Sequence, residues 1–190
     1  MKKILIISLK SLILFTIITG IIYPLLITGV SRLFFPFESE GSLIRADNNI
    51  VGSELIAQKF DTSIYFHSRP SAIDYNPMPS GATNFGPTSD TLKRLTELRR
   101  KNFAEENGLQ SDTNIPEDAI FASGSGVDPD ISAENAKLQM NRIVKARNFD
   151  QNQTKKLEEL INRLTEKPQF GILGETRINV LLLNIELDKI

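Results

Sequence analysis

Three side chains that can each form several hydrogen bonds, Asn135, Gln139 and Arg142, are spaced four and three residues apart. Because an α-helix turns about 100° per residue, this spacing aligns them along one flank of a helix predicted over residues 133–147. The flank borders the apolar face of that helix. Two interpretations stay open: a hydrated shoulder of the helix, or a hydrogen-bonding edge for a partner chain or a ligand.

A short serine and glycine turn precedes that helix, formed by Ser123, Gly124, Ser125 and Gly126. Unhindered backbone N–H groups followed by a helix N-terminus can hold a phosphate group. The segment lacks the Gly-Lys-Ser/Thr of a P-loop and the Gly-x-Gly-x-x-Gly of a dinucleotide site. An ordinary turn is therefore the simpler interpretation, and phosphate binding is the alternative.

Other classes of site are excluded by composition. The chain has no cysteine and a single histidine, His67, so it cannot build a thiolate or multi-histidine metal centre. No Gly-x-Ser-x-Gly elbow is present. The near-neutral total charge argues against a nucleic-acid binder. We therefore expect no catalytic residues, no metal and no cofactor of the chain's own.

The elements expected to position these residues form an α+β domain. The patterns predict helices over 54–59, 90–107 and 133–147, and another that begins after Asp150 and ends before Pro168. They also predict a short strand over 119–122 and a long one over 177–187. Proline, glycine and asparagine predict a loop over 65–87, and residues 37–49 are expected to form a linker or a short strand pair.

An uncharged, mostly apolar run of 21 residues lies between Lys10 and Arg32. As a helix it would be about 31 Å long, which matches the hydrocarbon core of a bilayer. A cleaved signal peptide and a buried core helix are the alternatives, but the run is long for both. We expect residues 1–10 to form a short cytoplasmic N-terminus and 11–31 a transmembrane helix.

Charge predicts the orientation of this span. Three lysines precede it and two arginines follow it closely, so the positive-inside rule puts the N-terminus in the cytoplasm. Residues 32–190 would then form an extracytoplasmic domain. The first 32 residues hold four of the 22 basic side chains and none of the 23 acidic ones, so the remainder carries a net charge of −5.

Several longer blocks resemble the C subunit of the Kdp potassium-transporting ATPase. In sequence order they are residues 52–60, 65–72, 75–81, 84–87, 122–129 and 174–181. Together they extend from the end of the apolar run almost to the C-terminus. Asp130 and Thr176 stand where the family pattern has His and Pro, and Ala82-Thr83 stands where it has a second Gly followed by Ser.

The resemblance implies a single-pass accessory subunit of a potassium uptake complex in the inner membrane of a bacterium. Its partners would be a channel-like potassium-binding subunit, an ATP-hydrolysing P-type subunit, a small single-span subunit and membrane lipid. The family is described as a catalytic chaperone that raises the complex's affinity for ATP. The glutamine implicated in this effect matches Gln139. ATP would thus belong to the ATP-hydrolysing subunit, with direct contact by this chain as one option, and potassium is the transported ion.

An extracytoplasmic domain cannot touch cytoplasmic ATP, so the predicted orientation favours an indirect effect on ATP or a structural role at the potassium entrance. The alternative from a different class is a membrane-anchored envelope protein that binds a small ligand through loop 65–87.

Overall fold

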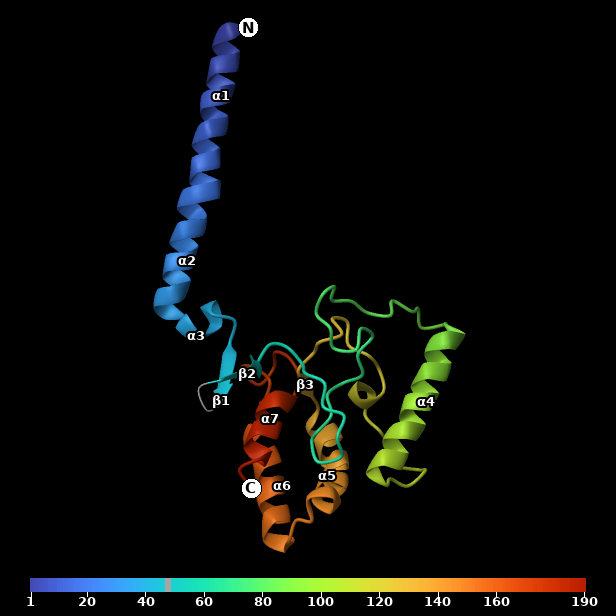
Figure 1. Ribbon diagram of the computed structural model, residues 1–190. Coiled ribbons are helices and arrows are strands. Elements are labelled where there is room, and N and C mark those ends of the chain that lie inside the picture. Colours follow the sequence, from blue (N-terminus) through green and yellow to red (C-terminus); the bar gives the residue numbers. More distant parts are fainter. Residues whose placement is uncertain (47–48) are drawn as a thin grey trace. The chain divides into compact units, whose positions relative to one another are not determined.

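The computed structural model describes residues 1–46 and 49–190 (Figure 1). The chain divides into two compact units, Met1–Val51 and Gly52–Ile190, and each is described by itself. One N-terminal apolar helix, several further helices and very small sheets make up the described chain, which confirms the predicted α+β class.

The first unit is dominated by one helical rod, α1 (Lys2–Ile17) and α2 (Tyr23–Phe34), joined by a π-helical turn. The rod spans Lys2–Phe34, 33 residues with a mean hydropathy of 2.3, and no residue of α1 or α2 is buried. It is thus long and apolar enough to cross a membrane. The helix predicted over 11–31 lies within it.

The π-helical turn Ile18–Ile22 has a local cause. Pro24 has no N–H, so the carbonyl of Gly20 loses its usual partner four residues ahead. The N–H of Tyr23 bonds instead to the carbonyl of Ile18, five residues back. One wide turn therefore accommodates the proline without ending the rod.

The first unit continues beyond the rod through a short helix and a strand pair, in place of a bare linker. These are α3 (Pro36–Ser39), β1 (Leu43–Ala46) and β2 (Asn49–Ser53), and β1 pairs with β2. A short strand pair was one of the two interpretations of residues 37–49.

The second unit contains the three predicted capped helices. They are α4 (Asp90–Asn107), α5 (Ala133–Arg147) and α6 (Gln151–Leu164). Ser89 caps α4 through the N–H of Leu92, and Gly108 ends it with φ +62°. Asp150 and Gln153 form a capping box at the start of α6. The predictions of these three helices are confirmed. They succeed because the residues that mark each end lie within or next to the helix itself.

The predicted strand over 177–187 is wrong. Only Ile178–Asn179 is a strand, β4, and Val180–Leu187 forms helix α7. The side chain of Asn179 accepts a hydrogen bond from the N–H of Leu182 and so caps the helix. The run shows no apolar period because Leu182 and Ile185, on the half-buried side of the helix, are apolar as well. A run without a period does not distinguish a buried helix from a buried strand.

Two further short elements were predicted wrongly. Residues 54–59 form turns and irregular backbone, since the N–H of Ala57 bonds to the carbonyl of Val127 instead of a neighbouring helical turn. Leu55 is exposed. In place of a strand over 119–122 there is a 3₁₀ turn, Glu117–Ala119, followed by a buried Ile120.

The core of the second unit lies among α5, α6 and α7 (Figure 1). Strand β3 (Asp130–Ile131) pairs antiparallel with β4, Ile131 opposite Ile178, and closes one end of it. A smaller cluster under α4 contains Ile115 and Ile120. Loop 65–87 contains no helix or strand, as predicted, yet it sends one large side chain, Phe66, into the main core.

Candidate functional site

Two amide side chains, Gln139 of α5 and Asn184 of α7, hydrogen-bond to adjacent residues of the loop that passes between these helices. We call this pair of side chains the clamp. Gln139 of α5 accepts a hydrogen bond from the N–H of His67 at 2.7 Å and donates one to the carbonyl of the same residue at 3.1 Å. Asn184 of α7 does the same for Phe66, at 2.8 and 2.9 Å. The two helices therefore hold this stretch as a strand partner would, without a neighbouring strand.

Gln139 is 1% exposed and Asn135 is also 1% exposed. The amide of Gln139 additionally donates to Asn135 Oδ1 at 2.9 Å and accepts from Arg142 Nη2 at 2.8 Å. The structure thus brings all three predicted residues together. It contradicts the interpretation of this flank as a hydrated shoulder of the helix, because a loop far away in the sequence covers it.

Arg142 ties three parts of the second unit together. Its Nη1 donates to the carbonyls of Ser63 and Tyr65 at 2.8 and 2.9 Å, and its Nε donates to Asn107 Oδ1 of α4 at 3.0 Å. Burial lowers its pKa, but an arginine remains charged at any physiological pH. Carbonyl and amide dipoles stabilise this buried cation, and among the described residues no carboxylate forms an ion pair with it.

The N-terminus of α5 is already occupied by a carboxylate. Asp118 accepts from the N–H of Ser132 at 2.7 Å, from its hydroxyl at 3.0 Å and from Asn135 Nδ2 at 3.0 Å. A helix N-terminus favours negative charge, and Asp118 supplies it from within the chain. This end of α5 therefore offers little to an incoming phosphate.

Both serine hydroxyls of the serine and glycine turn already accept hydrogen bonds from nearby backbone N–H groups. The N–H of Gly126 bonds to Ser123 Oγ at 2.9 Å and the N–H of Val127 to Ser125 Oγ at 3.2 Å. Gly126 has φ +74°, and a Cβ there would lie 2.8 Å from the carbonyl oxygen of Gly81. The structure thus favours the ordinary turn, packed against loop 65–87, over a phosphate cradle. Gly124 is exposed at its tip.

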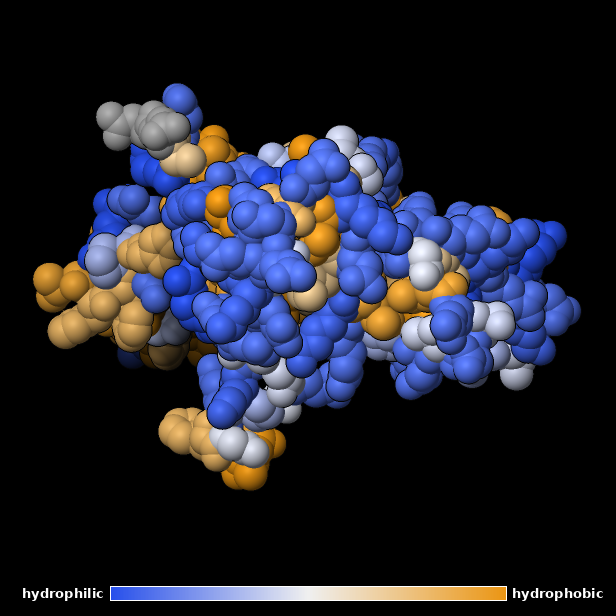
Figure 2. All heavy atoms as spheres, turned by 90° about the horizontal axis from the view of Figure 1, so that it is seen from below, coloured by the Kyte–Doolittle hydropathy of each residue, from blue (hydrophilic) through white to orange (hydrophobic). Residues whose placement is uncertain are grey.

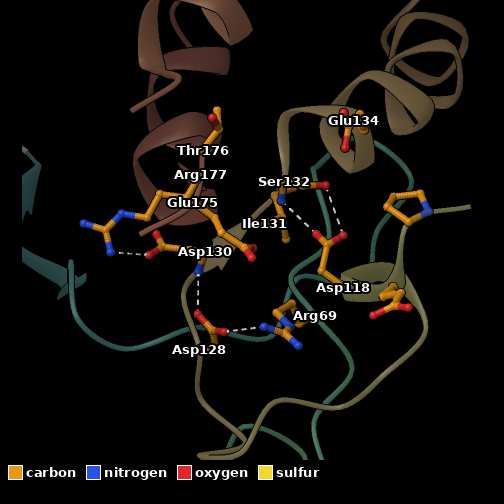
Figure 3. Close-up of a pocket in the computed structure, with 12 residues that line it drawn as sticks. Arg69, Asp118, Asp128, Asp130, Ile131, Ser132, Glu134, Glu175, Thr176 and Arg177 are labelled. Carbon is orange, nitrogen blue, oxygen red and sulfur yellow. Dashed lines mark hydrogen bonds and ion pairs between the residues drawn. The ribbon is translucent and has the colours of Figure 1, made fainter. Parts of the chain in front are cut away.

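An open hollow of about 560 Å³ lies beside β3 and the start of α5 (Figure 3). Six carboxylates line it, Glu117, Asp118, Asp128, Asp130, Glu134 and Glu175, with only two arginines. Figure 3 shows Arg69 paired with Asp128 and Arg177 with Asp130, each at 3.0 Å. Burial raises the pKa of Asp130, and Arg177 opposes this. The excess of acids disfavours a polyanion such as ATP. Among the described residues, no group of His, Cys, Asp or Glu fits a metal ion.

The comparisons with known proteins give one family. Residues 5–189 match the family described as the c chain of the K⁺-transporting ATPase, KdpC. The chain belongs to the KdpC family. Among its relatives named potassium-transporting ATPase KdpC subunit, that of Leptospira interrogans is 46% identical, covering 96% of this chain and 92% of the relative. Those of Mycobacterium tuberculosis and Gemmatimonas aurantiaca are 43% and 45% identical, covering 100% and 92% of this chain and 100% and 86% of the relatives.

Loop 65–87 of this KdpC-family chain also contributes to a cavity beside α4. His67, Ser68, Pro70 and Tyr75 lie on one side of it, and its volume is about 200 Å³. Small-molecule sites are usually about 300–1,000 Å³. The cavity is therefore small for the ligand pocket that the alternative function required of this loop.

Sequence reasoning missed Asn184, which matters as much as Gln139 to this clamp. Asn184 lies inside the strand predicted over 177–187, to which helical spacing does not apply. The polar residues Asn179 and Asn184, five apart in an otherwise apolar run, were the available signal. One caps α7 and the other faces the loop.

We expect His67 to make the KdpC-family domain less stable as the pH falls below about 6.5. Burial, and then the positive charge of Arg142, lower the pKa of His67 below its ordinary 6.5. The hydrogen bond between His67 Nε2 and the Thr62 carbonyl at 3.1 Å, and then Glu106 and Asp61, oppose this lowering of the pKa only in part. Because the unfolded chain then binds the proton more tightly, the contribution of neutral His67 is complete above pH 6.5 and is lost on acidification.

Urea unfolding of the full chain in detergent, followed by circular dichroism at pH 7.5 and 5.5, checks this. The His67→Gln variant should show a smaller drop in the unfolding midpoint between the two pH values. An equal drop in both proteins would contradict the assignment.

Proposed function

We propose that the chain is a non-catalytic accessory subunit of an ATP-driven potassium uptake complex. The match over residues 5–189, with relatives of 43–46% identity named as subunits of a potassium-transporting ATPase, carries this proposal. Its partners are a channel-like potassium-binding subunit, an ATP-hydrolysing P-type subunit and a small single-span subunit, in the inner membrane of a bacterium. Membrane lipid surrounds the apolar rod.

Residues 32–190 lie outside the membrane, and the chain raises the complex's affinity for ATP indirectly. Two features of the second unit support an indirect effect: the acidic hollow repels nucleotide phosphates, and the serine and glycine turn bonds to itself. An indirect effect requires the domain to contact two states of the pump with different free energies. The clamped loop gives the domain a defined surface for such contacts.

Co-purification tests this proposal. The tagged full chain, expressed with the other subunits and extracted in mild detergent, should retain the ATP-hydrolysing subunit. Removing this chain should raise the ATP concentration that gives half-maximal potassium-stimulated hydrolysis, while the purified chain alone hydrolyses no ATP. Failure to retain the ATPase would contradict the proposal and favour the envelope-binding alternative.

We expect single-span topology with the domain outside. The chain has no cysteine, so single cysteines report accessibility without background. In intact spheroplasts, an impermeant thiol reagent should label Ser111→Cys, which is exposed in the second unit. It should label Ser8→Cys only after permeabilisation. The reverse pattern would overturn the orientation, and a mature N-terminus near Arg32 would overturn the anchor.

A further inference from the structure

The segment Pro168–Gly174 forms a turn, and we call its exposed apolar side chains, Phe170, Ile172 and Leu173, the apolar tip. Phe170 is 91% exposed, Ile172 81% and Leu173 57%. The segment has no charged residue. Apart from the apolar rod, the described chain exposes few other large apolar side chains to this degree. On the face drawn in Figure 2 the surface is largely hydrophilic, with apolar atoms gathered in small groups.

Hydrogen bonds within the turn fix the backbone of this tip. Gln169 and Leu173 exchange two hydrogen bonds, 2.8 and 2.9 Å, and the N–H of Gly171 bonds to the carbonyl of Pro168. Phe170, Gly171 and Gly174 have positive φ, so the turn follows a tight, defined path. The three apolar side chains are therefore presented by an ordered turn.

The base of the tip is anchored to the small sheet. Glu166 and Arg177 pair as an isolated bridge, and the Arg177 side chain forms ion pairs with Glu166 and with Asp130 of β3, each at 3.0 Å. Positions on both sides of the tip are thus fixed to the core of the second unit. Such preorganisation lowers the entropy cost of binding to a shaped pocket.

We propose that this tip inserts into an apolar pocket on another protein subunit of the potassium-transporting ATPase. The inference rests on the proposed function, which places other subunits beside this chain. A few large side chains that become buried at an interface carry most of its binding energy. A water-exposed phenylalanine followed closely by two aliphatic side chains has the chemistry of such an anchor. Burying it also removes an apolar patch from water.

Charge argues against the bilayer surface as the occupant. The charges flanking the tip balance, Glu166 and Glu175 against Lys167 and Arg177, so they give no net attraction to an anionic lipid surface. Residues 33–190 as a whole carry a net charge of −5, which such a surface repels. A lipid surface also gains nothing from a defined turn geometry. A protein pocket uses both the shape and the absence of charge.

The first test is retention of the full chain in the assembled complex. The double variant Phe170→Ser, Ile172→Ser should dissociate from the detergent-extracted complex at least about tenfold faster than the wild type. Met78→Ser removes an apolar side chain that is 82% exposed elsewhere and is the matched control. Both variants should unfold at the wild-type urea midpoint. Wild-type retention by the double variant would overturn the inference and leave the proposed function standing, whereas loss of the wild-type chain would contradict the proposed function itself.

The second test separates a protein pocket from lipid. Gln169→Cys, exposed in the tip, takes an environment-sensitive fluorophore and keeps all three apolar side chains. Its emission should shift to the blue in the assembled complex and not in the chain alone, reconstituted in phosphatidylethanolamine and phosphatidylglycerol vesicles. A blue shift in vesicles alone would assign the tip to the bilayer. No shift in either sample would show that the tip stays in water. Both results would overturn the inference.

Discussion

Replacing Gln139 by alanine is expected to lower the free energy of unfolding by about 2–4 kcal/mol, since each buried polar group left without a partner costs about 1–3 kcal/mol. The change removes the partner of the His67 N–H and of the His67 carbonyl, both in partly buried hydrogen bonds. It also takes an acceptor from Arg142 and a donor from Asn135.

Urea unfolding of the full chain in detergent measures this loss. Asn141→Ala is the matched control, because it removes an exposed amide from the same helix and should change stability by no more than about 0.5 kcal/mol. Equal stability of Gln139→Ala and wild type would show that the clamp contributes nothing to folding.

The place of Gln139 in the clamp allows the proposed indirect effect on ATP to be tested. If the domain acts on ATP indirectly, Gln139→Ala should change the ATP dependence of the complex by altering the loop that Gln139 holds. The comparison that separates this from direct nucleotide contact is Asn184→Ala, which loosens the neighbouring peptide from another helix. Equal shifts in both variants fit an effect through the loop. A shift with Gln139→Ala alone fits direct contact.

Replacing Phe66 by alanine is expected to cost about 3–5 kcal/mol. Its side chain is 0% exposed and packs in the main core with Ile143, Leu157 and Leu183. The clamp fixes the Phe66 backbone at both its N–H and its carbonyl, so the chain cannot move inward to fill the space. A cavity therefore remains and adds to the lost transfer energy.

Phe170→Ala is the matched control for this change, since the same side chain is removed from a position that is 91% exposed. It should leave the unfolding midpoint unchanged, while Phe66→Ala lowers it and leaves the urea dependence of the free energy similar. If both variants unfolded at the wild-type midpoint, loop 65–87 would not be part of the cooperative core.

The sequence alone determined the elements whose signals are local. The uncharged run before Arg32 predicted the apolar helix, and the caps at Ser89, Ser132 and Asp150 predicted the three helices that follow. A cap, a period of 3.6 residues and an end signal all lie within one segment. Nothing distant needs to be known to interpret them.

The tertiary structure alone decided the rest. Val180–Leu187 is a helix whose half-buried side carries the apolar Leu182 and Ile185, so its apolar residues show no period and only its packing identifies it. The polar flank of α5 became an interior clamp because a loop about 70 residues earlier in the chain covers it. Whether a polar flank faces water or a backbone depends on which segment packs there, and no spacing within the helix contains that information.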